Sequence, residues 1–197
     1  LPGLKVVIPS TAHDAKGLMI SAIRDENPVV FMFHKNLQGM GWLGTVQGAI
    51  TDVPEADYET PLGLARVARP GRDVTVVGLG ATVHQALDAA SDLADRGVEV
   101  EVLDLRSLVP LDRDAILSSV RRTGRLVVVD DDYMSYGLSG EIIATVVERD
   151  VSCLKAAPVR VAHPDVPIPF ARPMEQFALP NAEKVIAAVE KTLGKAT

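Results

Sequence analysis

The segment from Pro2 to Phe33 constrains the fold of this chain most, because it predicts a strand, a helix and a strand in immediate succession. The apolar run Leu4 to Ile8 predicts the first strand, and Thr11 to Asp14 has the pattern of a capping box that starts the helix. Asn27-Pro28 ends that helix, and the continuous apolar run Val29 to Phe33 is typical of a strand buried on both faces. One such unit cannot bury its own surfaces. We therefore expect it to be the closing piece of a parallel-sheet domain that other segments complete.

Beyond this unit, strand-like and helix-like segments alternate with short connections. That order indicates an α/β fold, with a mostly parallel sheet and helices on both faces. A glycine-rich and then acidic, proline-containing stretch separates the two parts, so we expect one domain to end over residues 1–35, a linker over residues 36–60 and a second domain over residues 61–197. The expected strands are Val74 to Leu79, Val98 to Leu105, Leu126 to Asp130 and Val159 to Ala162, and the expected helices are Val83 to Asp95, Arg113 to Arg122, Glu141 to Arg149 and Ala182 to Thr192.

Composition and charge narrow the classes of partner and compartment. With 47% hydrophobic residues the 197-residue chain has the composition of a well-buried globular protein, and its net charge of −6 with scattered basic residues argues against nucleic acid or an anionic membrane as a partner. The lone Cys153 cannot form an internal disulfide, and we find neither a membrane-length apolar stretch nor a targeting segment before Leu4. We therefore expect a cytoplasmic protein.

The turn Gly78-Leu79-Gly80 follows an expected strand and precedes an expected helix, where a dinucleotide could bind through its phosphates. The dinucleotide fingerprint requires a third glycine, and Val83 stands at that position. Thr82 and Gln85 have the spacing of a capping box that would occupy the free amides. We interpret the turn as structural.

Two further candidates for chemistry also have structural interpretations. Gly137 to Glu141 has the outline of a nucleophile elbow but lacks the final glycine, so we expect Ser139 to be a residue of the helix start. Cys153 has no activating neighbour in sequence and is best explained as a packing residue.

The acidic and histidine residues give weaker signals. Asp130-Asp131-Asp132 follows an expected strand, and it is either a solvated acidic loop or a site for a metal or a basic partner segment. The histidines occur singly, without the spacing of a transition-metal site, and are expected to be capping, core-edge or surface residues; they are His13, His34, His84 and His163.

The segment Ala22 to Asn27 lies at the end of the first expected helix. The last carbonyl groups of a helix lack partners and carry partial negative charge, and Asp25 and Asn27 add oxygen atoms that suit an alkali or alkaline-earth cation. An ordinary helix end has the same carbonyl groups, so the residues alone leave both interpretations open.

Segments along nearly the whole chain carry a family resemblance; they are Pro2 to Ser10, Asp14 to Leu18, Ala22 to Val30, Val53-Pro54, Tyr58, Pro61 to Gly63, Asp73 to Val77, Asp104 to Arg106, Gly137 to Glu141 and Asp165 to Pro169. Taken in order, they resemble the beta subunit of the thiamine-diphosphate-dependent 2-oxo acid dehydrogenases, which act on pyruvate, branched-chain oxo acids or acetoin. This resemblance implies the end of a pyrimidine-binding domain followed by a complete transketolase-type C-terminal domain.

The resemblance also implies an activity, which is oxidative decarboxylation on thiamine diphosphate with acyl transfer to lipoyllysine. In that family the decisive glutamate and histidine of the beta subunit lie upstream of the Pro2-Gly3-Leu4 motif, and the alpha subunit binds the diphosphate and its magnesium. We therefore assign no catalytic or thiamine-binding residue within these residues, and we expect the isolated 197-residue chain to be inactive.

The implied partners are an alpha subunit and a second beta subunit, in a heterotetramer, and the dihydrolipoyl acyltransferase core. This portion would serve assembly and partner docking, with residues 61–197 folding autonomously as a dimerising domain. The resemblance further implies a structural potassium ion at the end of the first helix, with Ala22, Ile23, Asp25 and Asn27 at the ligand-bearing positions.

Two alternatives remain open at this point. The first is the C-terminal part of another thiamine enzyme, of the transketolase or deoxyxylulose-phosphate synthase type, and the second is a non-catalytic assembly domain. Nothing in the sequence chooses among the 2-oxo acids and acetoin, and the segment His34 to Trp42 departs from the pattern of each.

Overall fold

The main sheet has five strands, and the computed structural model describes residues 2–39 and 46–195 of the chain. The strands lie in the order β3 (Arg66–Arg69), β5 (Val100–Asp104), β4 (Val74–Gly78), β7 (Leu126–Tyr133) and β8 (Val159–His163). β3 runs antiparallel at one edge, and the other four strands are parallel. β4 and β5 are buried along their whole length, as expected for a sheet covered on both faces.

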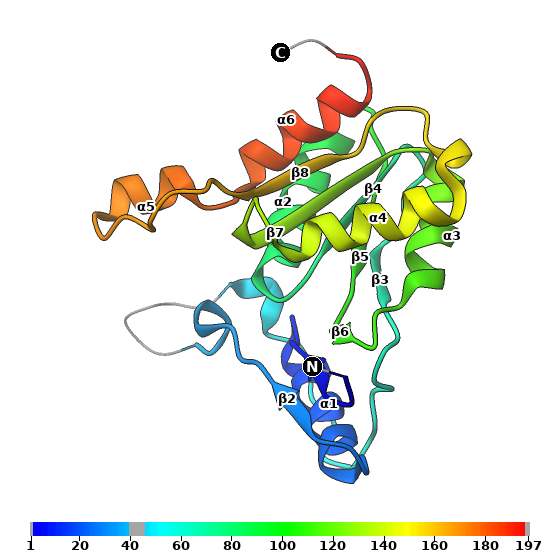
Figure 1. The fold of residues 1–197 in the computed structure, drawn as a ribbon. Coiled ribbons are helices and arrows are strands. Elements are labelled where there is room, and N and C mark those ends of the chain that lie inside the picture. The colour runs from blue at the N-terminus through cyan, green and yellow to red at the C-terminus, as the bar shows by residue number, and fades with distance from the viewer. Residues whose placement is uncertain (1, 40–45, 196–197) are drawn as a thin grey trace.

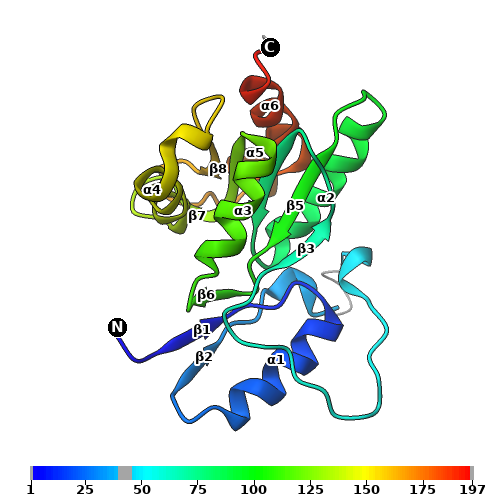
Figure 2. The same cartoon turned by 90° about the vertical axis from the view of Figure 1, so that its right-hand side faces the viewer.

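Two pairs of helices cover the faces of this sheet (Figure 1, Figure 2). α2 (Ala81–Ala94) and α6 (Ala182–Thr192) pack on one face, where Leu93 and Val189 belong to a buried apolar cluster. α3 (Arg113–Thr123) and α4 (Leu138–Asp150) pack on the other face, where Leu103, Ile116 and Ile142 form the second cluster. Within the described ranges, no helix combines the length and the apolar character that crossing a membrane requires.

A second, smaller sheet contains the beginning of the chain. Its strands are β1 (Lys5–Val7), β2 (Val29–Phe31) and β6 (Ser107–Val109), in the order β2-β1-β6, and α1 (Ala12–Arg24) connects β1 to β2. β2 runs parallel to β1, whereas β6 runs antiparallel to it. Figure 2 shows this sheet and α1 beneath the main sheet. Because β6 directly follows β5 in the chain, it links the two sheets.

The predicted α/β fold is confirmed, and each expected strand and helix corresponds to an observed element whose bounds differ by a few residues at most. Thr11 caps α1 as its pattern indicated, by accepting a hydrogen bond from the Asp14 amide. The sequence analysis missed β3, β6 and the short helix α5 (Arg172–Ala178). Among the described residues β2 is an edge strand and Phe33 is 53% exposed, so the expected burial of Val29 to Phe33 on both faces stays a prediction for the completed domain.

The expected capping box of Thr82 and Gln85 is also wrong. α2 begins at Ala81, and its N-cap is Gly80, whose φ of 55° favours glycine. The Thr82 hydroxyl accepts a hydrogen bond from the Leu79 amide at 2.8 Å and lies 2.9 Å from the Leu79 carbonyl oxygen. Gln85 Oε1 is buried without a hydrogen-bond partner in the described residues. The turn before α2 is thus stabilised by the hydroxyl of Thr82, a residue within the helix, and not by a capping box of Thr82 and Gln85.

The expected linker, residues 36–60, contains little regular structure. Its described residues form the short 3-10 helix Gln47–Ala49 and part of another, Lys35–Leu37. Residues 40–45, including Gly41, Trp42 and Gly44 of the expected linker, lie outside the described residues, as do residues 1, 196 and 197 of the expected domains. The division at residues 35 and 60 therefore stays a prediction.

An ion-pair network joins the small sheet to the main sheet. The buried Asp104 carboxylate, at the end of β5, accepts hydrogen bonds from the Ser10 hydroxyl and from Arg66 Nη2, the latter at 3.1 Å. Arg66 Nε lies 3.3 Å from Asp14 Oδ2 in α1, and Arg106 Nη1 donates to Asp14 Oδ1 at 3.0 Å. Burial raises the pKa of Asp104, while Ser10 and Arg66 act against that rise. The network therefore places α1 against the end of β5.

Candidate functional site

The turn after α1 contains the four residues expected to bind a cation. α1 ends at Arg24, and Asp25 follows with an extended backbone. Asp25 Oδ1 accepts hydrogen bonds from the Asn27 amide at 2.8 Å and from Asn27 Nδ2 at 3.1 Å. Asp25 Oδ2 accepts a hydrogen bond from Lys5 Nζ, at the start of β1. The carboxylate is thus fixed toward the small sheet.

The two remaining positions contribute only main-chain oxygen atoms. The described residues donate no hydrogen bond to the carbonyl oxygens of Ala22 and Ile23, and the Ile23 side chain is 76% exposed. Two carbonyl oxygens, a carboxylate and a carboxamide oxygen are the hard donors that an alkali cation prefers. The donor chemistry of the turn therefore fits such an ion.

Lys5 is the part of this site that the sequence analysis missed. The hydrogen bond from Lys5, followed by those from Asn27, lowers the pKa of Asp25 to about 2. The carboxylate is therefore ionised at neutral pH, and its charge already has a cationic neighbour. Lys5 lies in β1, and the parallel pairing of β1 with β2 brings it beside the end of α1. A lysine in the first strand was the only sequence signal for this contact.

The crevice at the carboxyl ends of β4 and β7 is the place where open parallel sheets bind nucleotides. Here Gly78, Leu79, Thr82 and Asp130 line a cavity of only about 10 Å³, which is too small for a nucleotide. The structural interpretation of the glycine turn therefore agrees with the geometry.

Asp130 itself is buried, so the expectation of a fully solvated acidic loop at Asp130 to Asp132 is wrong at its first residue. β7 continues through all three residues, and Asp130 Oδ2 accepts a hydrogen bond from the Ser139 amide at 2.9 Å. Burial raises the pKa of Asp130, whereas the hydrogen bonds from the backbone amides of Ser139 and Asp132 lower it. Ser139 lies in the first turn of α4, as expected, and its buried hydroxyl has no hydrogen-bond partner in the described residues.

The four histidines lie in different environments. His84 is buried, with Nε2 2.7 Å from the Ser10 carbonyl oxygen, and His163 is buried against the edge of the Tyr133 ring. His34 Nε2 lies 3.0 Å from Asp131 Oδ2, and His13 stacks on Tyr58. Across residues 2–39 and 46–195, no three His, Cys, Asp or Glu side chains converge in the manner of a metal site. Burial raises the pKa of the Cys153 thiol, which suits a packing role.

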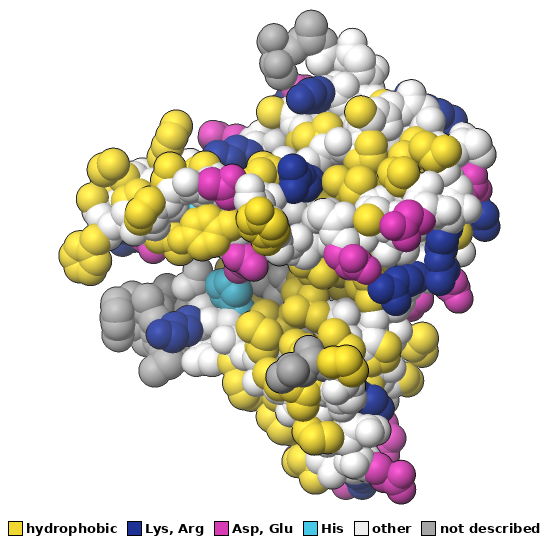
Figure 3. Space-filling view, in the orientation of Figure 1, with side chains coloured by type: hydrophobic (Ala, Val, Ile, Leu, Met, Phe, Trp, Pro, Cys, Tyr) yellow, Lys and Arg dark blue, Asp and Glu magenta, His cyan; other side chains and the backbone are white. Residues whose placement is uncertain are grey.

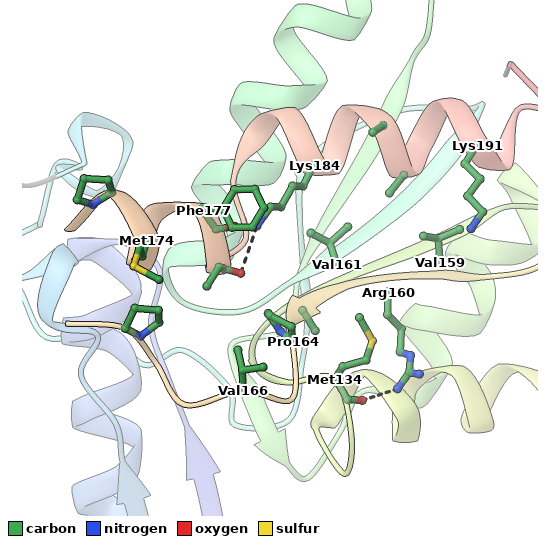
Figure 4. Close-up of a pocket in the computed structure, with 16 residues that line it drawn as sticks. Met134, Val159, Arg160, Val161, Pro164, Val166, Met174, Phe177, Lys184 and Lys191 are labelled. Atoms are coloured by element: carbon green, nitrogen blue, oxygen red, sulfur yellow. Dashed lines mark hydrogen bonds between the residues drawn. The ribbon is translucent and has the colours of Figure 1, made fainter. Parts of the chain in front are cut away.

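A large apolar groove was not foreseen. It has a volume of about 790 Å³ and lies between β8, α6 and α5 (Figure 4). We call it the β8 groove and define it by Val159 and Val161 of β8, Met174 and Phe177 of α5, and Ala188 of α6. Phe177 is 82% exposed. Figure 3 shows hydrophobic side chains gathered over the part of the molecule that contains α5, which projects to the left in Figure 1.

A sequence signal for the groove existed. Met174 and Phe177 are three residues apart, which is the spacing of neighbours on one helix face. The prolines at positions 169 and 173 disguised this pattern, although a proline at the start of a helix is favourable.

Comparisons with known proteins match the chain over both of its parts. The family model "Transketolase, C-terminal domain" matches residues 63–185, and "Transketolase, pyrimidine binding domain" matches residues 1–40. The beta subunit of acetoin:2,6-dichlorophenolindophenol oxidoreductase from Cupriavidus necator is 46% identical over 98% of this chain and 54% of its own length. The beta subunit of the pyruvate dehydrogenase E1 component from Bacillus subtilis is 43% identical over 98% of this chain and 56% of its own length.

A solved structure, a split-gene transketolase described as an inactive beta4 tetramer, matches with a TM-score of 0.77 and 28% identity. The match covers 100% of this chain and 60% of that one. This chain thus spans about half the length of the curated relatives it matches. It belongs to the transketolase C-terminal domain family, as a relative of the beta subunits of 2-oxo acid and acetoin dehydrogenases.

Proposed function

We propose that this chain forms the C-terminal part of the beta subunit of a thiamine-dependent 2-oxo acid dehydrogenase, and that this part provides assembly and partner docking. The observation that carries the proposal is similarity to such beta subunits along 98% of the chain, at identities of 46% and 43%. The transketolase alternative has less support, because the split-gene transketolase shares only 28% of its residues with this chain.

The described residues do not fit the diphosphate and magnesium of the cofactor. The cavity beside Gly78 has a volume of only about 10 Å³, and no cluster of metal-ligating side chains lies in the described ranges. We therefore derive no catalytic step here and propose that an alpha subunit binds these groups. The proposed complex also contains a second beta subunit and the acyltransferase core.

A chimera tests this function. Residues 2–195 would replace the corresponding C-terminal part of the Bacillus subtilis beta subunit, which would then be combined with that enzyme's own alpha subunit. We expect pyruvate-dependent reduction of an electron-accepting dye, with thiamine diphosphate and magnesium, by the chimeric complex and none by the 197-residue chain alone, because catalysis requires the whole constellation in place.

The control for this experiment is the same exchange made with the equivalent part of the split-gene transketolase. Turnover by the isolated chain would contradict the proposal. So would a folded chimera that fails to assemble with the alpha subunit.

We extend the proposal to a potassium ion at the turn after α1, held by the carbonyl oxygens of Ala22 and Ile23 and the side chains of Asp25 and Asn27. The support is the ionised carboxylate and the two carbonyl groups that accept no hydrogen bond from residues 2–39 and 46–195. Lys5 and the ion would then share the negative charge of Asp25.

The expected result is a higher thermal midpoint of unfolding in potassium chloride than in tetramethylammonium chloride at equal ionic strength. Asp25→Ala should abolish the difference, whereas Lys5→Met, which removes the competing ammonium group, should enlarge it. Identical midpoints in the two salts for the wild type and for Lys5→Met would favour an ordinary helix end.

We place the protein in the cytoplasm as part of the same proposal. The support is its single cysteine, which cannot form a disulfide within the chain. Proteins of the reducing cytoplasm rarely contain disulfides.

A further inference from the structure

The β8 groove combines a free strand edge with apolar side chains. β8 is the last strand of the main sheet, so the backbone groups on its outer edge have no strand partner in the described residues. Such an edge is a template for an added strand. In Figure 4, Val159 and Val161 lie beneath α6, and Phe177 lies at the α5 end. An extended chain bound there gains backbone hydrogen bonds and apolar contacts together.

The charged residues that line the groove are all cationic: Arg160, Lys184 and Lys191, without a carboxylate from the described part of the chain. Lys184 Nζ donates to main-chain carbonyl groups at the end of α5, including that of Leu179 at 2.7 Å, and so ties α5 to α6. Arg160 Nη1 donates to the Met134 carbonyl oxygen at 2.6 Å and makes no ion pair within the described residues. The groove is therefore locally positive, although the chain as a whole has a net charge of −6.

The charges argue against a second copy as the occupant. In a two-fold dimer the same patch lies on both sides of the interface. Two copies joined through the groove would therefore place Arg160 and Lys191 close to the same cations of the partner, and like charges across an interface are unfavourable. Carboxylates from a different chain complement them.

We propose that the β8 groove binds an extended segment of another protein chain that alternates apolar and acidic side chains. The segment adds to the edge of β8, with its apolar side chains on the α6 face, toward Val161 and Phe177, and its carboxylates on the opposite face, toward Arg160. This inference rests on the proposed function, because it names one surface through which this part of the protein docks a partner.

The test uses a labelled synthetic peptide of alternating valine and glutamate, with fluorescence anisotropy as the readout. We expect saturable binding to the chain that weakens with salt, and about tenfold weaker binding by Arg160→Glu and by Phe177→Asp. The same peptide with alternate amides N-methylated should lose its affinity, because it cannot pair with β8.

Matched variants outside the groove are Lys155→Glu and Ile50→Asp, at exposed positions, and both should bind the peptide as the wild type does. Equal binding of a valine-lysine peptide, or no binding of the valine-glutamate peptide, would overturn the proposal. Self-association of the chain that Phe177→Asp abolishes would assign the groove to a second copy and overturn it too. If Phe177→Asp fails to fold by circular dichroism, Arg160→Glu decides.

Peptide binding is measured without catalysis, so its failure is separate from a failure of the chimera. Loss of chimera assembly with peptide binding intact would count against the proposed function alone.

Discussion

Arg66→Met should lower the free energy of unfolding by about 3 kcal/mol at neutral pH, since removing one partner of a buried ion pair leaves the other charge uncompensated. Asp104, which is fully buried, would keep only the Ser10 hydroxyl and the Arg106 amide as hydrogen-bond donors. Asp14 would keep Arg106 as its ion-pair partner. The expected value is at the lower end for buried pairs, because Arg66 itself is 38% exposed.

The pH dependence identifies Asp104 as the cause. Burial raises the pKa of Asp104, and Arg66 opposes that rise, so the pKa in Arg66→Met should be higher still. A carboxyl group with a raised pKa in the folded state contributes less stability as the pH rises through the interval between its unfolded and folded values. The difference between wild type and variant should therefore shrink in acid, where Asp104 is protonated.

Urea unfolding at several pH values measures this difference. The double variant Arg66→Met, Asp104→Asn is the control, and it should recover part of the lost stability at neutral pH. A loss that is the same at every pH would show that Asp104 ionisation is not its source.

Leu103→Ala should lower the free energy of unfolding by about 2–5 kcal/mol, because it removes a buried side chain and leaves a cavity. Leu103 lies in β5, is 1% exposed and packs in the cluster formed with α3 and α4. The midpoint of urea unfolding should fall while the slope stays unchanged.

Two controls accompany this variant. Leu103→Met nearly conserves volume and should cost less than about 1.5 kcal/mol. Leu64→Ala, at a residue that is 51% exposed, should change stability by no more than about 0.5 kcal/mol. A loss at Leu64 equal to that at Leu103 would contradict the assignment of the core.

The elements that sequence could predict are those whose signals are local. α6 was predicted with its observed bounds, since Asn181 caps it and Val185, Ala188 and Val189 give one apolar face. The central strands were predicted because they are short and rich in valine and leucine, with only Thr75 in β4 and Glu101 and Asp104 in β5 as polar residues. β3 and β6 were missed because they are short, and their place depends on distant partners, β5 and β1.

The candidate site shows the same limit. The sequence placed Ala22, Ile23, Asp25 and Asn27 at one helix end, which is a local property. It could not show that Lys5 meets Asp25, because that contact depends on how β1 and β2 pair. The β8 groove is likewise made by three elements that only the tertiary fold brings together.

The pairing of β1 with β6 has a consequence for the order of folding. Val6 pairs with Val109, so β1 can pair on both of its edges only after the chain has been synthesised past β6. The α2 and α3 helices and the centre of the main sheet form through closer contacts, and contacts of short sequence separation form faster. We infer that β6 joins the small sheet late and that, on the ribosome, the edge of β1 that pairs with β6 stays open until then. Such an edge is prone to association with other chains.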